Sequence, residues 1–288
     1  MAAAAAAAAA AVTLALAVGA AAPPAGNFTM CALYVNQTLG GFSYGRVAPS
    51  GGVKDLMDLP GLAAVFDGAA AGAEEGTFYT YCGYGPPPQK STGILEANFI
   101  ANTTVYREVK MPADYSGNFF TQELSTDWSG ASLALVGVVR GITGPDDAFT
   151  WSALASIDPA TGSATVRRNL TLEEDGFKWV KTGCSCFDSE GQVFYLIAGI
   201  GASEAETVLG YDSKGSAPTS IPFPATYDAI ALQFSVLLKT VVALAYERNS
   251  PSASFSWLVY DAATKAWKPA VSNTCTRRCP LLSSPDPP

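Results

Sequence analysis

The 288-residue chain contains no histidine. This excludes the serine–histidine–aspartate triad, the cysteine–histidine pair, histidine-ligated zinc and the usual general base near neutral pH. Carboxylates, hydroxyls and aromatic rings remain for chemistry. Acidic side chains recur in four successive segments, and these are the catalytic candidates: Asp67, Glu123 with Asp127, Asp188 and Asp228. Two such carboxyls can hydrolyse a glycosidic bond when one is the acid and the other the nucleophile or base.

The same acids also have a structural interpretation. Asp67 and Asp188 lie at predicted turns, where aspartate is favoured because its side chain accepts hydrogen bonds from nearby backbone amides. Asp228 lies in a similar place before a predicted strand. Both interpretations stay open from the sequence.

No cofactor or metal motif accompanies these acids. Gly199-Ile200-Gly201 lacks the third glycine and the following helix of a dinucleotide-binding loop. Acidic pairs such as Glu173-Glu174 lack the spacing of a calcium loop. A four-thiolate metal site is an alternative that lacks the spacing of paired zinc knuckles: Cys184, Cys186, Cys275 and Cys279. We therefore expect no cofactor and no metal.

The elements that must position the acids are short strands in a repeating order. The stretch from Lys181 to Phe223 contains four apolar runs separated by turn residues, which predicts one four-stranded antiparallel sheet. The same order returns from Tyr227 to Ser272. Markers of the repeat lie at residues 48, 101, 158, 212 and 261, which are 53, 57, 54 and 49 residues apart by subtraction. A period in this range is typical of stacked or radial repeats.

Three turns carry a family resemblance. Asp158 to Gly162 and Tyr260 to Trp267 resemble the outer-strand turns of kelch-type and quinoprotein-type β-propeller blades, and Phe187 to Tyr195 resembles the first hairpin of NHL-type blades. The chain lacks the paired glycines of kelch and the Gly-His and Trp-Asp signatures of the WD type. The resemblance implies an all-β propeller of four-stranded antiparallel blades. Five blades are favoured, and six blades or an open sandwich are alternatives.

Composition limits the class of partner. With 49% hydrophobic and 15% charged residues, the chain can bury a large core. Its net charge of −8 disfavours nucleic acid, because neutralising phosphates requires clustered Lys and Arg. The basic pairs, Arg167-Arg168 and Arg277-Arg278, are too few for that purpose.

Residues 1–22 are predicted to be a secretory signal peptide. An alanine run and Val12 to Val18 supply its apolar part, and Ala20-Ala21-Ala22 is a small-residue cleavage pattern before Pro23-Pro24. A retained anchor or a plain alanine tract is the alternative. Residues 23–288 would then form one domain without a membrane span, because Gln233 and Lys239 interrupt the longest other apolar stretch.

Sequons and cysteines fit an exported chain. Four sequons predict N-linked glycans at Asn27, Asn36, Asn102 and Asn169. An even number of cysteines predicts disulfides, with the connectivity open: Cys31, Cys82, Cys184, Cys186, Cys275 and Cys279. We expect the C-terminal tail to supply the missing strand of the first unit and a disulfide to fix the ring closed.

Aromatic residues suggest a contact surface. Tyr79, Tyr81 and Tyr84 crowd around Cys82 beside a proline-rich turn, a cluster of the sort found in binding loops. The five tryptophans are expected to pack between blades.

These observations predict a secreted glycoprotein that acts as a non-catalytic recognition module for an extracellular glycan or protein. Propeller folds also host enzymes, so fold alone does not settle function. The first alternative follows from the family resemblance, because acids of the inner strands converge at the central funnel in five-bladed propeller glycosidases. It is a carboxylate-dependent glycan hydrolase that uses the acids Asp67, Glu123, Asp188 and Asp228. The second alternative is a structural component of a cell wall or matrix.

Overall fold

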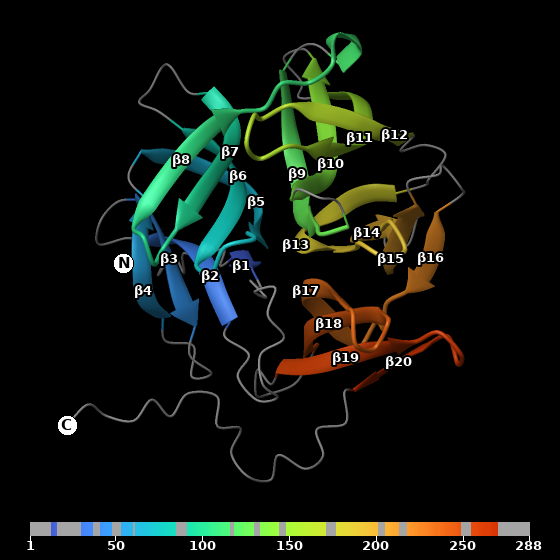
Figure 1. The fold of residues 1–288 in the computed structure, drawn as a ribbon. Helices are drawn as coiled ribbons and strands as arrows, with labels where there is room; N and C mark the ends of the chain where they lie inside the picture. Colours follow the sequence, from blue (N-terminus) through green and yellow to red (C-terminus); the bar gives the residue numbers. More distant parts are fainter. Residues whose placement is uncertain are drawn as a thin grey trace, which may run out of the picture.

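The fold is described from a computed structural model. It describes residues 13–15, 30–36, 41–47, 53–59, 61–84, 91–115, 118–129, 133–143, 148–170, 177–200, 205–212, 218–248 and 255–269. In these residues the chain is an all-β propeller of small antiparallel sheets (Figure 1). The described part contains one short helix, the 3-10 turn Ala113–Tyr115.

Each sheet is a meander of four strands that follow one another in the chain. The first sheet contains β1 (Thr13–Ala15), β2 (Met30–Asn36), β3 (Gly41–Val47) and β4 (Val53–Leu59). The second contains β5 (Leu62–Ala71), β6 (Thr77–Tyr84), β7 (Ser91–Asn98) and β8 (Thr103–Glu108). The third contains β9 (Asn118–Asp127), β10 (Ala134–Thr143), β11 (Ala148–Ile157) and β12 (Ala164–Leu170).

Two further sheets complete the described chain. The fourth contains β13 (Phe177–Asp188), β14 (Val193–Ile200), β15 (Ala205–Asp212) and β16 (Thr219–Pro222). The fifth contains β17 (Tyr227–Ser235), β18 (Thr240–Glu247), β19 (Phe255–Asp261) and β20 (Ala266–Pro269). The first strands of neighbouring sheets contact one another: β5 contacts β9, β9 contacts β13, and β13 contacts β17. Residues of these first strands therefore lie closest to the middle of the molecule (Figure 1).

The core lies between the sheets, because both faces of most strands are covered. On β6, Phe78 and Cys82 pack against the first sheet, whereas Tyr79 and Tyr81 pack against the third. Alternate side chains of a strand point to opposite faces, so one strand serves two layers of core. A similar division holds for β14, whose Leu196 and Ile197 belong to different clusters.

Several hairpin turns are fixed by an acidic or amide side chain. Asp188 Oδ1 accepts the backbone N–H of Glu190 and of Gly191 at 3.0 and 2.9 Å. Asp261 accepts in the same way from Ala263 and Thr264. Asp158, which accepts from Ala160 at 2.8 Å, and Asp261 are two of the repeat markers of the sequence, so the turn chemistry explains these two positions.

The first sheet differs from the expected arrangement. We expected the C-terminal tail to supply its missing strand, but the structure places Thr13–Ala15 beside β2, with Thr13 opposite Leu33. The tail, residues 270–288, lies outside the described residues. Thr13–Ala15 lies within the segment predicted as a signal peptide. No helix of the described chain is long and apolar enough to cross a membrane.

Two glycines let tryptophan rings lie against the backbone of a neighbouring strand. A Cβ added to Gly199 would lie 2.2 Å from Cε2 of Trp179, the residue opposite it on β13. A Cβ added to Gly141 would lie 2.2 Å from Cε2 of Trp151, its partner on β11. The absence of a side chain at these positions therefore allows the rings to pack between strands.

We predict that Gly199→Ala lowers the free energy of unfolding by about 1–3 kcal/mol, because the new methyl group overpacks against the Trp179 ring. Gly41→Ala is the matched control, since nothing lies within 4 Å of its added Cβ. Chemical denaturation of the three proteins checks this, and equal stability of Gly199→Ala and the parent would show that the Trp179 contact does not constrain the fold.

Candidate functional site

A cluster of charged side chains joins the fourth sheet to the fifth. Lys181 comes from β13, Glu206 from the start of β15 and Asp228 from the start of β17. Tyr246 near the end of β18 and Arg248 just after it complete the group, which we call the Lys181 cluster. These positions lie at the end of the sheets where the first strands begin, because adjacent antiparallel strands run in opposite directions.

The Lys181 ammonium bonds two carboxylates at once. Its Nζ lies 2.5 Å from Glu206 Oε1 and also donates to Asp228 Oδ1. Arg248 Nη2 lies 3.2 Å from the same Glu206 oxygen. The side chains of Lys181 and Asp228 are 23% and 24% exposed, so the pair is partly shielded from water yet reachable from it.

These hydrogen bonds keep Asp228 ionised. Burial alone would raise the pKa of Asp228, but hydrogen bonds from Lys181 and Tyr246 outweigh burial and bring it below its ordinary value. Burial likewise favours a lower pKa for Lys181, and the hydrogen bonds to Asp228 and Glu206 reverse that and raise it. Asp228 is therefore a carboxylate, and Lys181 an ammonium, at neutral pH.

Glu123 lies in an irregular part of β9. The pairing of β9 with β10 shifts between Gly137 and Val138, and Glu123 has a positive φ of 64°. The neighbouring strand β13 is irregular too, with Gly183 at a φ of 79°. The Gly183 N–H donates to Glu123 Oε1 at 2.9 Å, so the irregular part of one first strand meets that of the next.

Glu123 is a protonated acid at neutral pH. Burial raises its pKa to about 8, and the hydrogen bond from Gly183 only partly opposes this. The residue is 1% exposed, and its Oε2 has no hydrogen-bond partner among the described residues. Glu206 Oε2 is also buried without a partner there.

Glu123 belongs to the same neighbourhood as the Lys181 cluster. Burial raises the pKa of the Cys184 thiol; Glu123, once it is ionised, and the carboxylates of Glu206 and Asp228 raise it further against the effect of Lys181. Cys184 follows Gly183 directly, so all these charges surround one short piece of β13. Two carboxyls with pKa values moved in opposite directions therefore lie beside the same irregular strand.

The structure separates the four acids named from the sequence. Glu123 and Asp228 each bond to the same part of β13, through Gly183 and Lys181, while Asp188 lies at the other end of β13 and fixes a turn. The structural interpretation is therefore correct for Asp188. Asp67 lies on β5, and its side chain is outside the described residues.

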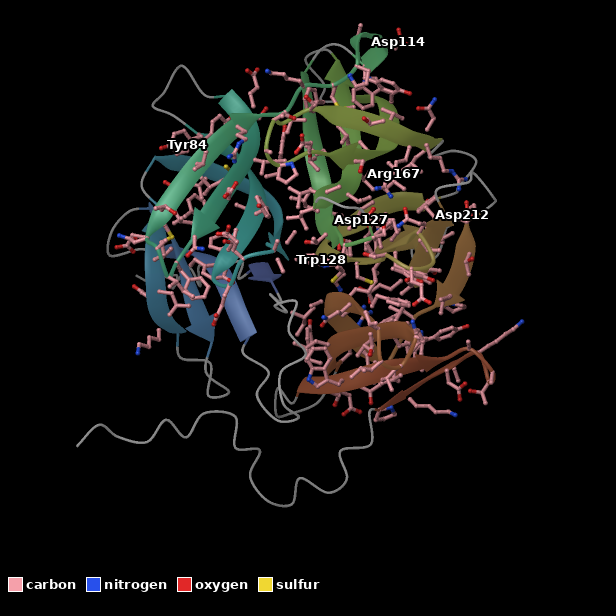
Figure 2. The ribbon with its side chains drawn as sticks, in the orientation of Figure 1. Tyr84, Asp114, Asp127, Trp128, Arg167 and Asp212 are labelled. Carbon is pink, nitrogen blue, oxygen red and sulfur yellow. The ribbon has the colours of Figure 1, made fainter. Side chains whose placement is uncertain are left out.

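Asp127 belongs to a separate network at the Asp188 end. Its Oδ2 lies 2.7 Å from Arg167 Nη2, and Figure 2 shows the two side chains between the third and fourth sheets. Arg167 also donates to Ser156 and to Gln192. The Arg167 donors and the Asp127 carboxylate are therefore hydrogen-bonded to other groups of the protein, which indicates a structural role for both residues.

The expected tyrosine-lined binding loop is not a loop in the structure. Tyr79 and Tyr81 are 7% and 0% exposed in the core between the second and third sheets. Tyr84, labelled in Figure 2, stacks on Tyr106 with ring centroids 5.0 Å apart. These rings pack on strand β6 because its alternate positions face two covered sides, which the sequence motif alone did not reveal.

The cysteines of the fourth sheet do not form the disulfides we expected. Cys184 and Cys186 are free thiols, both buried in the apolar cluster between the fourth and fifth sheets. Cys82 is buried between the first two sheets. The side chains of Cys31, Cys275 and Cys279 lie outside the described residues. Free cysteine packs as a small apolar residue, so Cys184 and Cys186 can lie in this apolar layer without forming a disulfide.

Two of the four sequons can be placed. Asn102 lies in the exposed turn between β7 and β8, and Asn169 is exposed on β12, where its Oδ1 accepts a hydrogen bond from Tyr115 at 2.5 Å. Asn27 and the side chain of Asn36 lie outside the described residues. Within the described part of the chain, no group of three or more acidic or cysteine side chains is arranged to hold a metal ion.

Sequence reasoning missed four members of the Lys181 cluster: Lys181, Glu206, Tyr246 and Arg248. One signal was present, because Lys181 is the one charged residue of the run from Lys181 to Phe187. A second was the hairpin register of β17 and β18, which places Tyr246 opposite Asp228. The pairing of Lys181 with Asp228 joins different sheets, and no local pattern predicts it.

Comparison with solved structures identifies related propellers. The Bacteroides ovatus protein "Xyloglucan PUL GH43B" matches with a TM-score of 0.50 at 15% identity, over 90% of this chain and 53% of that one. An "oligogalacturonate lyase in complex with manganese" matches with a TM-score of 0.48 at 11% identity, over 83% of this chain and 61% of that one. The GH43_1 enzyme from Xanthomonas citri complexed with xylose matches with a TM-score of 0.49 at 10% identity, over 89% of each chain.

The likeness to the Bacteroides ovatus protein shows the fold and corrects one expectation. The chain spans 61% and 53% of the length of the lyase and of the GH43B protein. No family model matches the sequence, and no curated protein matches it. The expectation of a non-catalytic recognition module is contradicted, because the Bacteroides ovatus protein that shares this fold carries the name "Xyloglucan PUL GH43B".

We predict that Glu123 makes stability depend on pH. Its pKa is raised from 4.5 in the unfolded chain to about 8 in the folded protein, so its contribution is complete below pH 4.5 and is lost as pH rises to about 8. The loss amounts to at most roughly 5 kcal/mol. Urea unfolding across this pH range should show that Glu123→Gln removes most of the slope of the free energy of unfolding against pH.

The control for this prediction is Glu190→Gln. The Glu190 side chain is 73% exposed and pairs with Lys239 at the surface, where an ion pair contributes little. This variant should keep the slope of the parent. A slope that Glu123→Gln leaves unchanged would show that Glu123 is ionised in the folded protein at neutral pH.

Proposed function

We propose that this chain is a carboxylate-dependent glycan hydrolase of the propeller type. One observation carries the proposal: two carboxyls of first strands, Glu123 and Asp228, lie beside the same irregular stretch of β13, and their pKa values move in opposite directions. A glycosidase needs one protonated and one ionised carboxyl. The fold shared with the Bacteroides ovatus protein "Xyloglucan PUL GH43B" supports a glycan as the class of substrate.

The two acids take different roles in the reaction. Glu123 gives its proton to the glycosidic oxygen as the bond from that oxygen to the sugar carbon breaks. Asp228 either attacks the sugar carbon or takes a proton from the attacking water, and water finally supplies a hydroxyl to the sugar and a proton to the acid. Lys181 keeps Asp228 ionised. Because Glu123 is 1% exposed, this assignment requires substrate binding to uncover it.

The ring architecture proposed for the enzyme has five blades. It is supported by the five antiparallel sheets of the described residues, of which the first keeps β2, β3 and β4 when residues 1–22 are removed, and by the contacts among β5, β9, β13 and β17. Contacts of β2 and β3 with β5 support a position of the first sheet beside the second.

The activity test is release of reducing ends from a panel of xyloglucan, arabinan, β-1,3-galactan and oligogalacturonate. We predict that Asp228→Asn lowers kcat by about 10²–10⁴-fold, because it removes the ionised carboxylate. Asp188→Asn is the control, since asparagine can accept the same turn hydrogen bonds far from the cluster. For the parent, kcat/KM should fall above a pH of about 8, as Glu123 loses its proton.

Three results would contradict the proposed function. The first is absence of turnover by the parent on every member of the panel. The second is equal activity of Asp228→Asn and Asp188→Asn, which would place the chemistry elsewhere. The third is an activity that stays constant through pH 8, which would show that Glu123 is not the proton donor.

We also propose that the protein is exported and glycosylated, with residues 1–22 removed. The exposure of Asn102 and Asn169 supports glycosylation. Mass spectrometry of protein from the medium of expressing cells should find an N-terminal peptide beginning at Pro23 and a glycan on Asn102. A peptide containing Thr13–Ala15 would contradict removal of the leader and would favour the pairing of β1 with β2 in the mature protein.

A further inference from the structure

Tyr246 lies directly opposite Asp228 in the hairpin of β17 and β18. Its hydroxyl donates a hydrogen bond to Asp228 Oδ2 at 2.6 Å. The other carboxylate oxygen, Oδ1, accepts from Lys181. Each oxygen of the carboxylate therefore has a different donor, and the two donors come from different sheets.

Hydrogen bonds from two donors, one to each oxygen, fix the orientation of a carboxylate. With Lys181 alone, the carboxylate could rotate about its Cβ–Cγ bond and keep one hydrogen bond. With Tyr246 on the second oxygen, rotation breaks one of the two bonds. The Tyr246 bond is charge-assisted, and such bonds are stronger than those between neutral groups. It also helps to hold the pKa of Asp228 below its ordinary value.

The ring of Tyr246 is open to solvent. Tyr246 is 37% exposed and belongs to none of the buried core clusters of the described residues. By contrast, Tyr260 of the neighbouring strand β19 packs against the core and lies 5.5 Å from the Trp267 ring. The Tyr246 ring is therefore not held in place to fill the interior.

We infer that Tyr246 is a positioning and specificity-determining residue of the hydrolase proposed above. Its hydroxyl orients Asp228 toward the reacting sugar carbon or water, and the exposed face of its ring receives the apolar C–H face of the same sugar. An aromatic side chain with a polar tip suits both tasks, because the ring packs on apolar surface while the hydroxyl forms a hydrogen bond. This inference rests on the proposed function, and it names a substrate with an accessible pyranose or furanose face at the Asp228 subsite.

Two substitutions separate the roles. Tyr246→Phe keeps the ring and removes the hydroxyl, so we expect kcat to fall about tenfold or more while KM changes little. Without the hydrogen bond from the hydroxyl, the pKa of Asp228 rises. The acidic limb of the pH profile, in which kcat/KM increases as Asp228 loses its proton, should therefore move to higher pH. Tyr246→Ala removes ring and hydroxyl together, so KM should rise in addition to the fall in kcat.

Tyr260→Phe is the matched control, because it makes the same chemical change on the adjacent strand away from Asp228. It should leave kcat, KM and the acidic limb at the values of the parent. Circular dichroism and the midpoint of thermal unfolding verify that each variant is folded. If Tyr246→Ala does not fold, Tyr246→Phe alone decides the positioning role through the acidic limb.

The outcomes distinguish this inference from the function on which it rests. Turnover by the parent with an unchanged kcat and acidic limb in Tyr246→Phe would overturn the positioning role and leave the hydrolase intact. An unchanged KM in folded Tyr246→Ala would overturn the stacking role. Absence of turnover by the parent would overturn the proposed function, and the role of Tyr246 with it.

Discussion

The ion pair of Lys181 with Asp228 is the interaction on which the candidate site depends. It joins β13 of the fourth sheet to β17 of the fifth, and Glu206 ties the same ammonium to β15. Moving charges out of water is costly, so a partly buried ammonium is stable only while its carboxylates remain in place. Removing Lys181 would leave two carboxylates close together, and one of them would then hold a proton more tightly. The cation thus determines which protonation state Asp228 has.

The backbone around this ion pair is irregular. The pairing of β13 with β14 is interrupted between Val180 and Ser185, which frees Lys181 from a regular ladder position and presents the Gly183 N–H to Glu123. A positive φ at Glu123 is unfavourable for a residue with a side chain, and such conformations cluster at functional sites. The rest of each sheet is regular, and its packed apolar layers hold the two irregular strands against each other. Rigid blades therefore support a small region in which backbone and charge depart from the common pattern.

The sequence predicts the fold well because the signals of the fold are local. Alternating apolar residues and turn residues such as Asp188 and Gly191 define strands and hairpins within a few residues, and their repeat predicts a propeller. The site depends on contacts between sheets, for which distance along the chain is a poor guide. Asp228 and Glu123 were among the candidates because acids near first strands are few, whereas the partners of Asp228 were not. Tyr79 and Tyr81 were misinterpreted because a tyrosine-rich strand that is covered on both faces has the same composition as an exposed loop.

The proposed chemistry requires Glu123 to be protonated and Asp228 to be ionised in the same folded protein at neutral pH. The most direct measurement is a pH titration of the carboxyl ¹³C signals by NMR, with assignments made from Glu123→Gln and Asp228→Asn. We expect a Glu123 signal that titrates near pH 8 and an Asp228 signal that titrates below the ordinary aspartate value of about 4. Titration of both signals near pH 4 would contradict the proposed chemistry, because the two carboxyls would then be equivalent and could not divide the roles of acid and base.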